Sequence, residues 1–184
     1  MSKSKTIVGL ALALTALAMA SSPVFAKGPK GPTVVDVAVS VNSEGPFAGA
    51  FDTLIAAVTC PAQEAVLDYL SGNGQRTVFA PTDDAFLALG LDETNVCDAL
   101  DGMVLSDILQ YHVAKGRRTS DLVATADQIR MLFGGFLDVQ FDGAMVTLID
   151  NLDREANVVV PDVPAANGVI HAIDAVVLPY DPAS

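Results

Sequence analysis

Basic residues are scarce in this sequence, which carries 10 Lys and Arg against 22 Asp and Glu and has a formal net charge of −12. Binding to nucleic-acid phosphates needs a basic footprint, so this charge argues against a nucleic-acid partner. It also disfavours adsorption to anionic membrane surfaces. An acidic balance of this size is typical of a protein that must stay soluble outside the cell.

Histidine is equally scarce, and His112 and His171 are the only two. His112 follows Ile108 by one turn on the apolar side of an expected helix, and His171 lies in an apolar strand pattern. A catalytic or metal-binding pair would need partners, but no G-x-S-x-G, H-E-x-x-H or G-x-G-x-x-G motif occurs. We therefore predict no metal site and no cofactor, and two buried histidines bonded to backbone carbonyls.

Cysteine is limited to Cys60 and Cys97. A reactive or metal-binding pair would be expected to show a C-x-x-C spacing or a histidine nearby, and neither is present. An even count in an exported chain favours a disulfide. Closing a loop of this length would stabilise the fold by about 4 kcal/mol.

The N-terminus has the pattern of an export signal. Lys3 and Lys5 precede an apolar run over residues 7–20, and "VFA" at residues 24–26 is an A-x-A-like cleavage site. The run is too short to span a bilayer comfortably. We predict a signal peptide over residues 1–26, with cleavage after Ala20 as an alternative, and a secreted or periplasmic protein without stable membrane insertion. Loss of the two lysines would bring the net charge from −12 to −14.

Residues 27–32, "KGPKGP", are expected to form a mobile Gly/Pro linker before a single domain over residues 33–180 and a short tail over residues 181–184. Apolar spacing of three and four residues predicts helices in the first part of the domain, and alternating or continuous apolar runs predict strands in the second. Helices followed by an antiparallel sheet indicate an α+β fold. The expected helices cover residues 51–58, 61–70, 82–89 and 105–112, and the expected strands cover residues 77–81, 136–141, 145–149, 157–161 and 168–179.

Two acidic segments are candidate sites. Asp83 and Asp84 follow Thr82, the expected N-cap of a helix, and neighbours in a helical turn diverge by about 100°, so helix capping is favoured over a pair of acid/base carboxylates. The segment over residues 150–157, "DNLDREAN", lacks the residue order of a calcium loop. We expect it to be a solvated loop.

Lys115, Arg117 and Arg118 form a dense basic cluster in this acidic chain. One interpretation is a solvated loop between two elements. The other is a small patch that recognises an anionic partner, such as a sulfated or carboxylated polymer.

Three segments occur in a characteristic order: "TVFAPTDDAF" at residues 77–86, "LQYHV" at residues 109–113 and "NGVIHAIDAVVLP" at residues 167–179. Together they strongly resemble the fasciclin domain family, whose two signature boxes match the first and last segments. The resemblance runs from about Thr33 to Tyr180. It implies an α+β fold in which a wedge of β-strands is flanked by several helices.

The resemblance also implies a non-catalytic role in adhesion or matrix organisation, with a surface polysaccharide or a protein as partner. In animal matrix members, the Tyr-His segment and an Asp-Ile dipeptide are associated with integrin binding. By position these become Tyr111, His112 and Asp162, although Asp162 is followed here by Val163. The alternative is an accessory protein that binds a small molecule or a glycan, and a cleft of several hundred Å³ with convergent polar groups would favour it.

Overall fold

The computed structural model describes residues 29–182, so the predicted signal peptide lies outside the described residues. The helices are α1 (Val34–Ser43), α2 (Asp52–Thr59), the 3-10 helix η1 (Pro61–Gln63), α3 (Glu64–Ser71), α4 (Asp83–Leu87), α5 (Val96–Ala99), α6 (Gly102–Tyr111) and α7 (Ser120–Ala124). The strands are β1 (Arg76–Pro81), β2 (Val113–Lys115), β3 (Gln128–Arg130), β4 (Phe136–Phe141), β5 (Val146–Ile149), β6 (Glu155–Ala165) and β7 (Gly168–Ile173).

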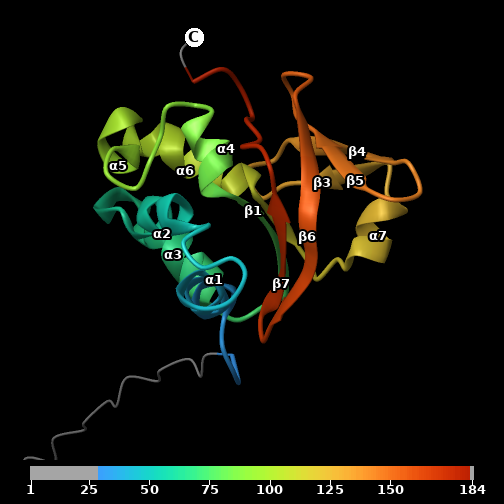
Figure 1. Ribbon diagram of the computed structural model, residues 1–184, viewed down its shortest axis with the longest axis horizontal. Coiled ribbons are helices and arrows are strands. Elements are labelled where there is room, and N and C mark those ends of the chain that lie inside the picture. The colour runs from blue at the N-terminus through green and yellow to red at the C-terminus, as the bar shows by residue number, and fades with distance from the viewer. Residues whose placement is uncertain (1–28, 183–184) are drawn as a thin grey trace, which may run out of the picture.

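All seven strands belong to one sheet in the order β2-β1-β7-β6-β5-β4-β3. A further bridge between Ala114 and Met131 brings the two edges of the sheet together, so the sheet is nearly closed. Figure 1 shows helices α1 to α6 gathered on one side of β1, β7 and β6, while β3 to β5 and α7 extend on the other side. The α+β wedge flanked by helices, predicted from the resemblance, is confirmed.

Two details of the predicted sheet are wrong. The sheet is mixed and not purely antiparallel, because β1 runs parallel to β7, with Phe79 opposite His171. The last strand ends at Ile173 and does not continue to Pro179. Both the backbone N–H and the carboxylate of Asp174 still bond to the backbone of Asn157, and the segment after it runs back toward α6, where the Val177 N–H donates to His112.

The sheet separates two apolar cores. Alternate residues of β1 and β7 point to opposite faces, so Ala80 and Ala172 pack against the helices while Phe79 and Ile173 pack inside the curled sheet. Cys60 belongs to the helix-side core and forms a disulfide with the exposed Cys97, with the two Cα atoms 5.7 Å apart. This pairing confirms the sequence prediction and joins the end of α2 to α5.

Helix capping by Asp83 differs from the prediction in its target. Thr82 is the N-cap of α4, but its side chain makes no capping hydrogen bond. The carboxylate of Asp83 instead accepts hydrogen bonds from the backbone N–H groups of Asp52 at 3.1 Å and Thr53 at 2.8 Å, at the start of α2. Asp83 therefore caps a helix that lies thirty residues away in the sequence.

The turn at Asn167 and Gly168 ties the two ends of the domain together. The Asn167 side chain accepts from the backbone N–H of Val34 at 2.8 Å and donates to the carbonyl of Leu70 at 2.8 Å. A Cβ atom at position 168 would lie 2.3 Å from the carbonyl oxygen of Arg76, so this close approach of two strands requires glycine.

Candidate partner-binding surface

Tyr111, one of the predicted partner contacts, is the last residue of α6, a helix whose N-cap Asp101 accepts a hydrogen bond from the backbone N–H of Met103 at 2.9 Å. The Tyr111 side chain is fully buried, and its O–H donates to the carbonyl of Phe136 at 2.5 Å. Burial raises the pKa of this phenol to about 12. Tyr111 therefore fastens α6 to β4.

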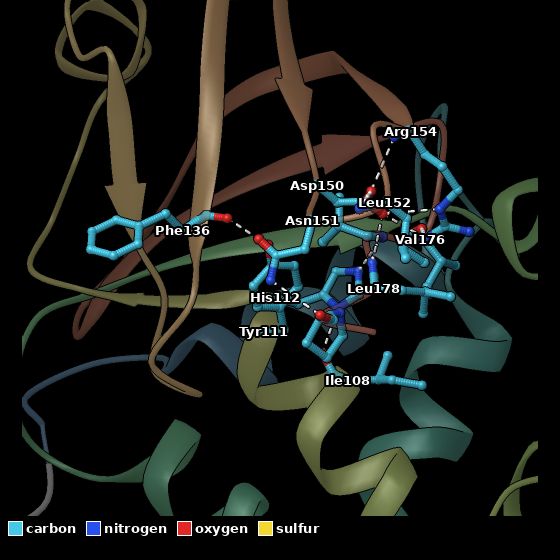
Figure 2. Close-up of polar contacts among 12 residues, drawn as sticks. Ile108, Tyr111, His112, Phe136, Asp150, Asn151, Leu152, Arg154, Val176 and Leu178 are labelled. Atoms are coloured by element: carbon cyan, nitrogen blue, oxygen red, sulfur yellow. Dashed lines mark hydrogen bonds and ion pairs between the residues drawn. The ribbon is translucent and has the colours of Figure 1, made fainter. Parts of the chain in front are cut away.

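His112, the next predicted contact, caps the same helix and is also buried. Its Nε2 accepts a hydrogen bond from the backbone N–H of Val177 at 3.2 Å, so Nδ1 carries the proton and donates to the carbonyl of Ile108 at 2.7 Å. Burial lowers the pKa of His112 to about 4. The sequence prediction of a buried histidine bonded to a backbone carbonyl is confirmed, and Figure 2 shows these bonds.

Asp150 extends this network. Residues 151–153 are an exposed loop as predicted, but Asp150 is buried and residues 155–157 belong to β6, so the prediction of a solvated loop over residues 150–157 holds only in part. The Asp150 carboxylate accepts from the backbone N–H of Leu178 at 2.9 Å and from that of Leu152 at 2.8 Å. Arg154 pairs with the same carboxylate at 2.7 Å and also donates to the carbonyl of Val176 (Figure 2). The segment folds around its first aspartate because a buried carboxylate needs several donors.

The Tyr-His segment therefore lies inside the domain. The polar atoms of both side chains are hydrogen-bonded to backbone groups of the protein, so none of them is available to a partner. Tyr111 and His112 would therefore affect a partner only indirectly, through the position of β4 or of the segment near Val177. Direct contact by these two side chains, as predicted from the resemblance, does not agree with their burial.

The basic cluster lies at the surface, on a segment that we call the basic loop, residues 115–118. The side chains of Lys115 and Arg117 are exposed. The Arg117 guanidinium donates to the carbonyl of Ala165 at 3.1 Å, and the backbone N–H of Arg118 donates to the Thr77 hydroxyl at 2.9 Å. These bonds attach the loop to β6 and β1, so its charges are held in place.

Asp162 lies next to this loop, at an irregular position of β6 where the backbone φ is 62°. Its carboxylate accepts hydrogen bonds from the backbone N–H of Ser120 at 2.9 Å and from the Ser120 hydroxyl. Partial burial acts to raise the pKa of Asp162, but the bonds from Ser120 and the charge of Arg117 outweigh it and lower that pKa. Asp162 thus stays ionised beside the basic loop.

His171 connects the basic loop to Asp162. It is buried, and its Nδ1 accepts from the backbone N–H of Asp162 at 3.1 Å, so Nε2 carries the proton and donates to the carbonyl of Arg118 at 2.8 Å. Its ring stacks on Phe79 at 5.6 Å between centroids, and burial lowers its pKa. Like His112, it confirms the prediction of a histidine bonded to a backbone carbonyl.

The structure thus brings Arg117 and Arg118 together with Asp162, whereas Lys115 lies at the end of β2, opposite Arg76 of β1. Sequence reasoning missed the parts played by Ser120 and His171 at this surface. His171 lies 53 residues from Arg118 in the chain, and no local pattern indicates a contact over that separation.

Two cavities beside helix α1 are small and apolar. One of about 60 Å³ lies between α1, α2 and β1, and another of about 20 Å³ lies on the β6 side of α1. For comparison, an apolar cavity of about 150 Å³ is known to hold benzene. Within residues 29–182, no three metal-ligating side chains gather as a metal site, and no helix is long and apolar enough to cross a membrane.

Comparison with known proteins places the chain among fasciclin domains. The sequence model of the fasciclin domain matches residues 49–179. Protein sll1483 of Synechocystis sp. is 33% identical, over 94% of this chain and 92% of that protein. Transforming growth factor-beta-induced protein ig-h3 of Sus scrofa is 31% identical, over 70% of this chain but only 18% of that protein.

A solved structure shows the same fold. It is described as a FAS1 domain pair from the insect cell adhesion molecule fasciclin I, and it superposes with a TM-score of 0.63 at 20% sequence identity. The match covers 80% of this chain and 51% of the solved one, so the chain corresponds to about half of that domain pair. With the family match spanning most of the described domain, this chain belongs to the fasciclin domain family.

Proposed function

We propose that this protein is a non-catalytic binding module, secreted or periplasmic, that attaches to a surface polysaccharide or a protein partner. The observation that carries the proposal is the basic loop. It displays Lys115 and Arg117 on a chain whose formal net charge is −12, and hydrogen bonds to Ala165 and Thr77 hold it in one conformation. Its local field is opposite to that of the acidic surface and is suited to an anionic partner.

The small size of the interior cavities favours binding at the surface over binding of a small molecule inside the protein. Interior cavities of about 60 and 20 Å³ are far below the several hundred Å³ typical of ligand pockets, and a larger hollow of about 590 Å³ is an open surface groove lined mainly by apolar side chains. The two histidines, the side chains best suited to acid–base chemistry, are both held neutral inside the protein by backbone partners. A binding surface is thus better supported than a catalytic cleft.

A patch of this size gives weak contacts that gain strength by repetition. Each exposed ion pair typically contributes less than about 1 kcal/mol and is screened by salt. A polymer with regularly spaced sulfates or carboxylates can engage many copies of the protein, so that avidity exceeds the affinity of one loop. We expect binding that weakens steeply as salt is added.

A matched pair of double variants tests this function. Lys115→Ser with Arg117→Ser removes two exposed charges from the basic loop, and Lys30→Ser with Arg130→Ser removes two exposed charges elsewhere. Binding to immobilised dextran sulfate and to polygalacturonate is measured at low and moderate salt. We expect the first variant to lose at least roughly tenfold in apparent affinity while the second stays close to wild type.

Equal losses in both variants would show a response to net charge alone and would contradict a role for the basic loop. Binding without any salt dependence would also exclude it, and would direct attention to Asp162 and Ser120 instead. Arg118 is left in place because its side chain is partly buried, with Nε shielded from solvent, so its replacement would change packing as well as charge.

We also propose the domain limits as residues 33–180, preceded by a signal peptide over residues 1–26 and a linker over residues 27–32, and followed by a tail. Thr33 begins the domain as the N-cap of α1, in a reciprocal capping box with Asp36. At the other end, the Tyr180 hydroxyl donates to Asp107 at 2.7 Å. Mass spectrometry of the exported protein tests the first limit, with Lys27 expected as its N-terminal residue.

A further inference from the structure

Strands β5 and β6 part after a short stretch of pairing. They pair from Ile149 opposite Glu155 to Thr147 opposite Asn157, and beyond that point the tip of the β4–β5 hairpin diverges from β6. A groove of about 590 Å³ opens there, bounded by α7, the hairpin and β6 (Figure 1 shows the three elements). Its lining residues are Ser120, Asp121, Ala124, Phe141, Ala144, Met145, Val146, Val158, Val159 and Pro161.

The groove exposes large apolar side chains at the surface. Phe141 is 51% exposed, Met145 45% and Val159 49%, although each has apolar neighbours in the same lining. An exposed apolar hollow of this kind is a candidate interaction site, because leaving it in contact with water costs free energy.

The floor of the groove includes backbone that lacks a strand neighbour. Among the described residues, β5 pairs with β6 no further than Asn157, so β6 from Val158 to Pro161 has no strand on its β5 side. Its other side pairs with β7, at Val158 and Val160. An unpaired strand edge offers N–H and C=O groups to an extended chain, which is how peptides add to sheets.

The charges at the groove are acidic. Asp121 belongs to the lining, and Asp142 lies in the hairpin turn between Phe141 and Ala144. Backbone N–H groups of Met145 and Ala144 donate to the Asp142 carboxylate at 2.8 Å and lower its pKa, so it stays ionised. An occupant with basic side chains is therefore favoured at this end of the groove.

We propose that the groove between β5 and β6 is the docking site for an extended peptide segment with apolar side chains at alternate positions and basic residues between them. One face of such a strand would pack on Phe141, Met145 and Val159, while its basic face would lie toward Asp121 and Asp142. The volume of about 590 Å³ lies within the range of ligand-binding grooves. The proposal rests on the proposed function of a binding module, but it concerns a second surface, of opposite charge to the basic loop.

The experiment uses a fluorescein-labelled peptide of alternating Lys and Val, seven residues long, whose binding to the full mature protein is followed by fluorescence anisotropy. Val159→Lys places a charge in the groove floor at an exposed position, and Phe141→Ser removes an aromatic side chain. Met103→Lys, at an apolar position that is 77% exposed on α6, is the matched control. We expect the two groove variants to weaken peptide binding by at least roughly tenfold and the control to leave it unchanged.

Further peptides and a sizing measurement distinguish the other outcomes. A peptide in which Glu replaces Lys, or in which a central Pro removes a backbone donor, should bind at least roughly tenfold more weakly. The proposal is overturned if all three variants bind the peptide alike, or if the Glu peptide binds as well as the Lys peptide. It is also overturned if the wild type is a dimer that Val159→Lys converts to a monomer, since a second copy would then fill the groove.

The experiments can contradict the proposal for the basic loop and the proposal for the groove independently of each other. Loss of polysaccharide binding in the Lys115 and Arg117 variant, with peptide binding intact, supports both proposals. Peptide binding that depends on Val159, in a protein that never binds the polymers, would contradict the basic loop and retain the groove.

Discussion

The two histidines of this chain make the same pair of hydrogen bonds in two different settings. His112 and His171 each donate to a carbonyl and accept from a backbone N–H, and both have a lowered pKa because they are buried. Around His112, every partner belongs to the interior. Around His171, the partners Arg118 and Asp162 belong to the candidate binding surface.

This difference shows that a buried neutral histidine can connect backbone segments in the core at one position and beneath a surface at another. A neutral imidazole can bridge two backbone segments that lie far apart in sequence, because it offers one donor and one acceptor on opposite sides of a rigid ring. At His112 the bridge closes the core between α6 and the segment near Val177. At His171 it sets the distance between the basic loop and β6.

The largest expected loss of stability comes from a change in the interior network around Asp150. Asp150→Ala leaves the Leu178 N–H without a partner in a buried position and removes the ion pair with Arg154. We expect the free energy of unfolding to fall by about 3–5 kcal/mol, measured by urea denaturation. Glu155→Ala, an exposed neighbour, should change it by less than about 0.5 kcal/mol. A loss below about 1 kcal/mol for Asp150→Ala would contradict the role given to this carboxylate.

Acidification should distinguish the two histidines next. The folded state holds the pKa of His112 at about 4 against an ordinary value of 6.5, so between these values the unfolded chain binds a proton that the folded chain does not. The free energy of unfolding should therefore fall as the pH drops through this window, by about 3 kcal/mol from His112 alone. Carboxylates with a lowered pKa, such as Asp142, act only below 3.8.

Single substitutions show how much each ring contributes. His112→Gln should flatten the decline more than His171→Gln, because both hydrogen bonds of His112 are buried whereas those of His171 are only partly buried. Urea denaturation between pH 7 and pH 4.5 provides the measurement. A wild-type free energy of unfolding that stays level across this range would refute the assignment of two neutral histidines.

The smallest effect is expected at Tyr111. Tyr111→Phe removes the O–H that donates to the Phe136 carbonyl and should lower the free energy of unfolding by about 1 kcal/mol. Tyr180→Phe is the matched control, because its O–H donates to Asp107 nearer the surface, where water can replace it. Equal losses of the free energy of unfolding in the two variants would show that burial of the Tyr111 hydroxyl does not increase its contribution to stability.

The sequence predicted best what depends on local patterns. The helical face at Leu105, Ile108 and Leu109, the hairpin at Asp142 and Gly143, and the burial of both histidines all follow from spacing within a few residues. The disulfide followed from the cysteine count. The parallel pairing of β1 with β7 and the end of the last strand at Ile173 were missed, because neither is visible in a window of the sequence.

The candidate surface shows the same division. Clustering in the sequence pointed to Lys115, Arg117 and Arg118, but the link between Arg118 and Asp162 through His171 comes only from the fold. Asp83 illustrates the point further, since its residue type predicted a cap and tertiary structure decided which helix it caps. The chemical role of a residue could be predicted from the sequence, whereas its partners at distant positions in the chain could not.

The parallel pairing of β1 and β7 has a consequence for folding. Arg76 lies opposite Gly168, so the centre of the sheet is made from residues separated by most of the domain. Proteins rich in such distant contacts fold slowly, because the entropy of closing a long loop is lost before the contacts form. The helices pack on a core that includes Ile170 and Ala172 of β7, and the sheet also needs β7 to close. A chain crossing a membrane from its N-terminus would therefore complete its fold only after almost the whole domain has emerged.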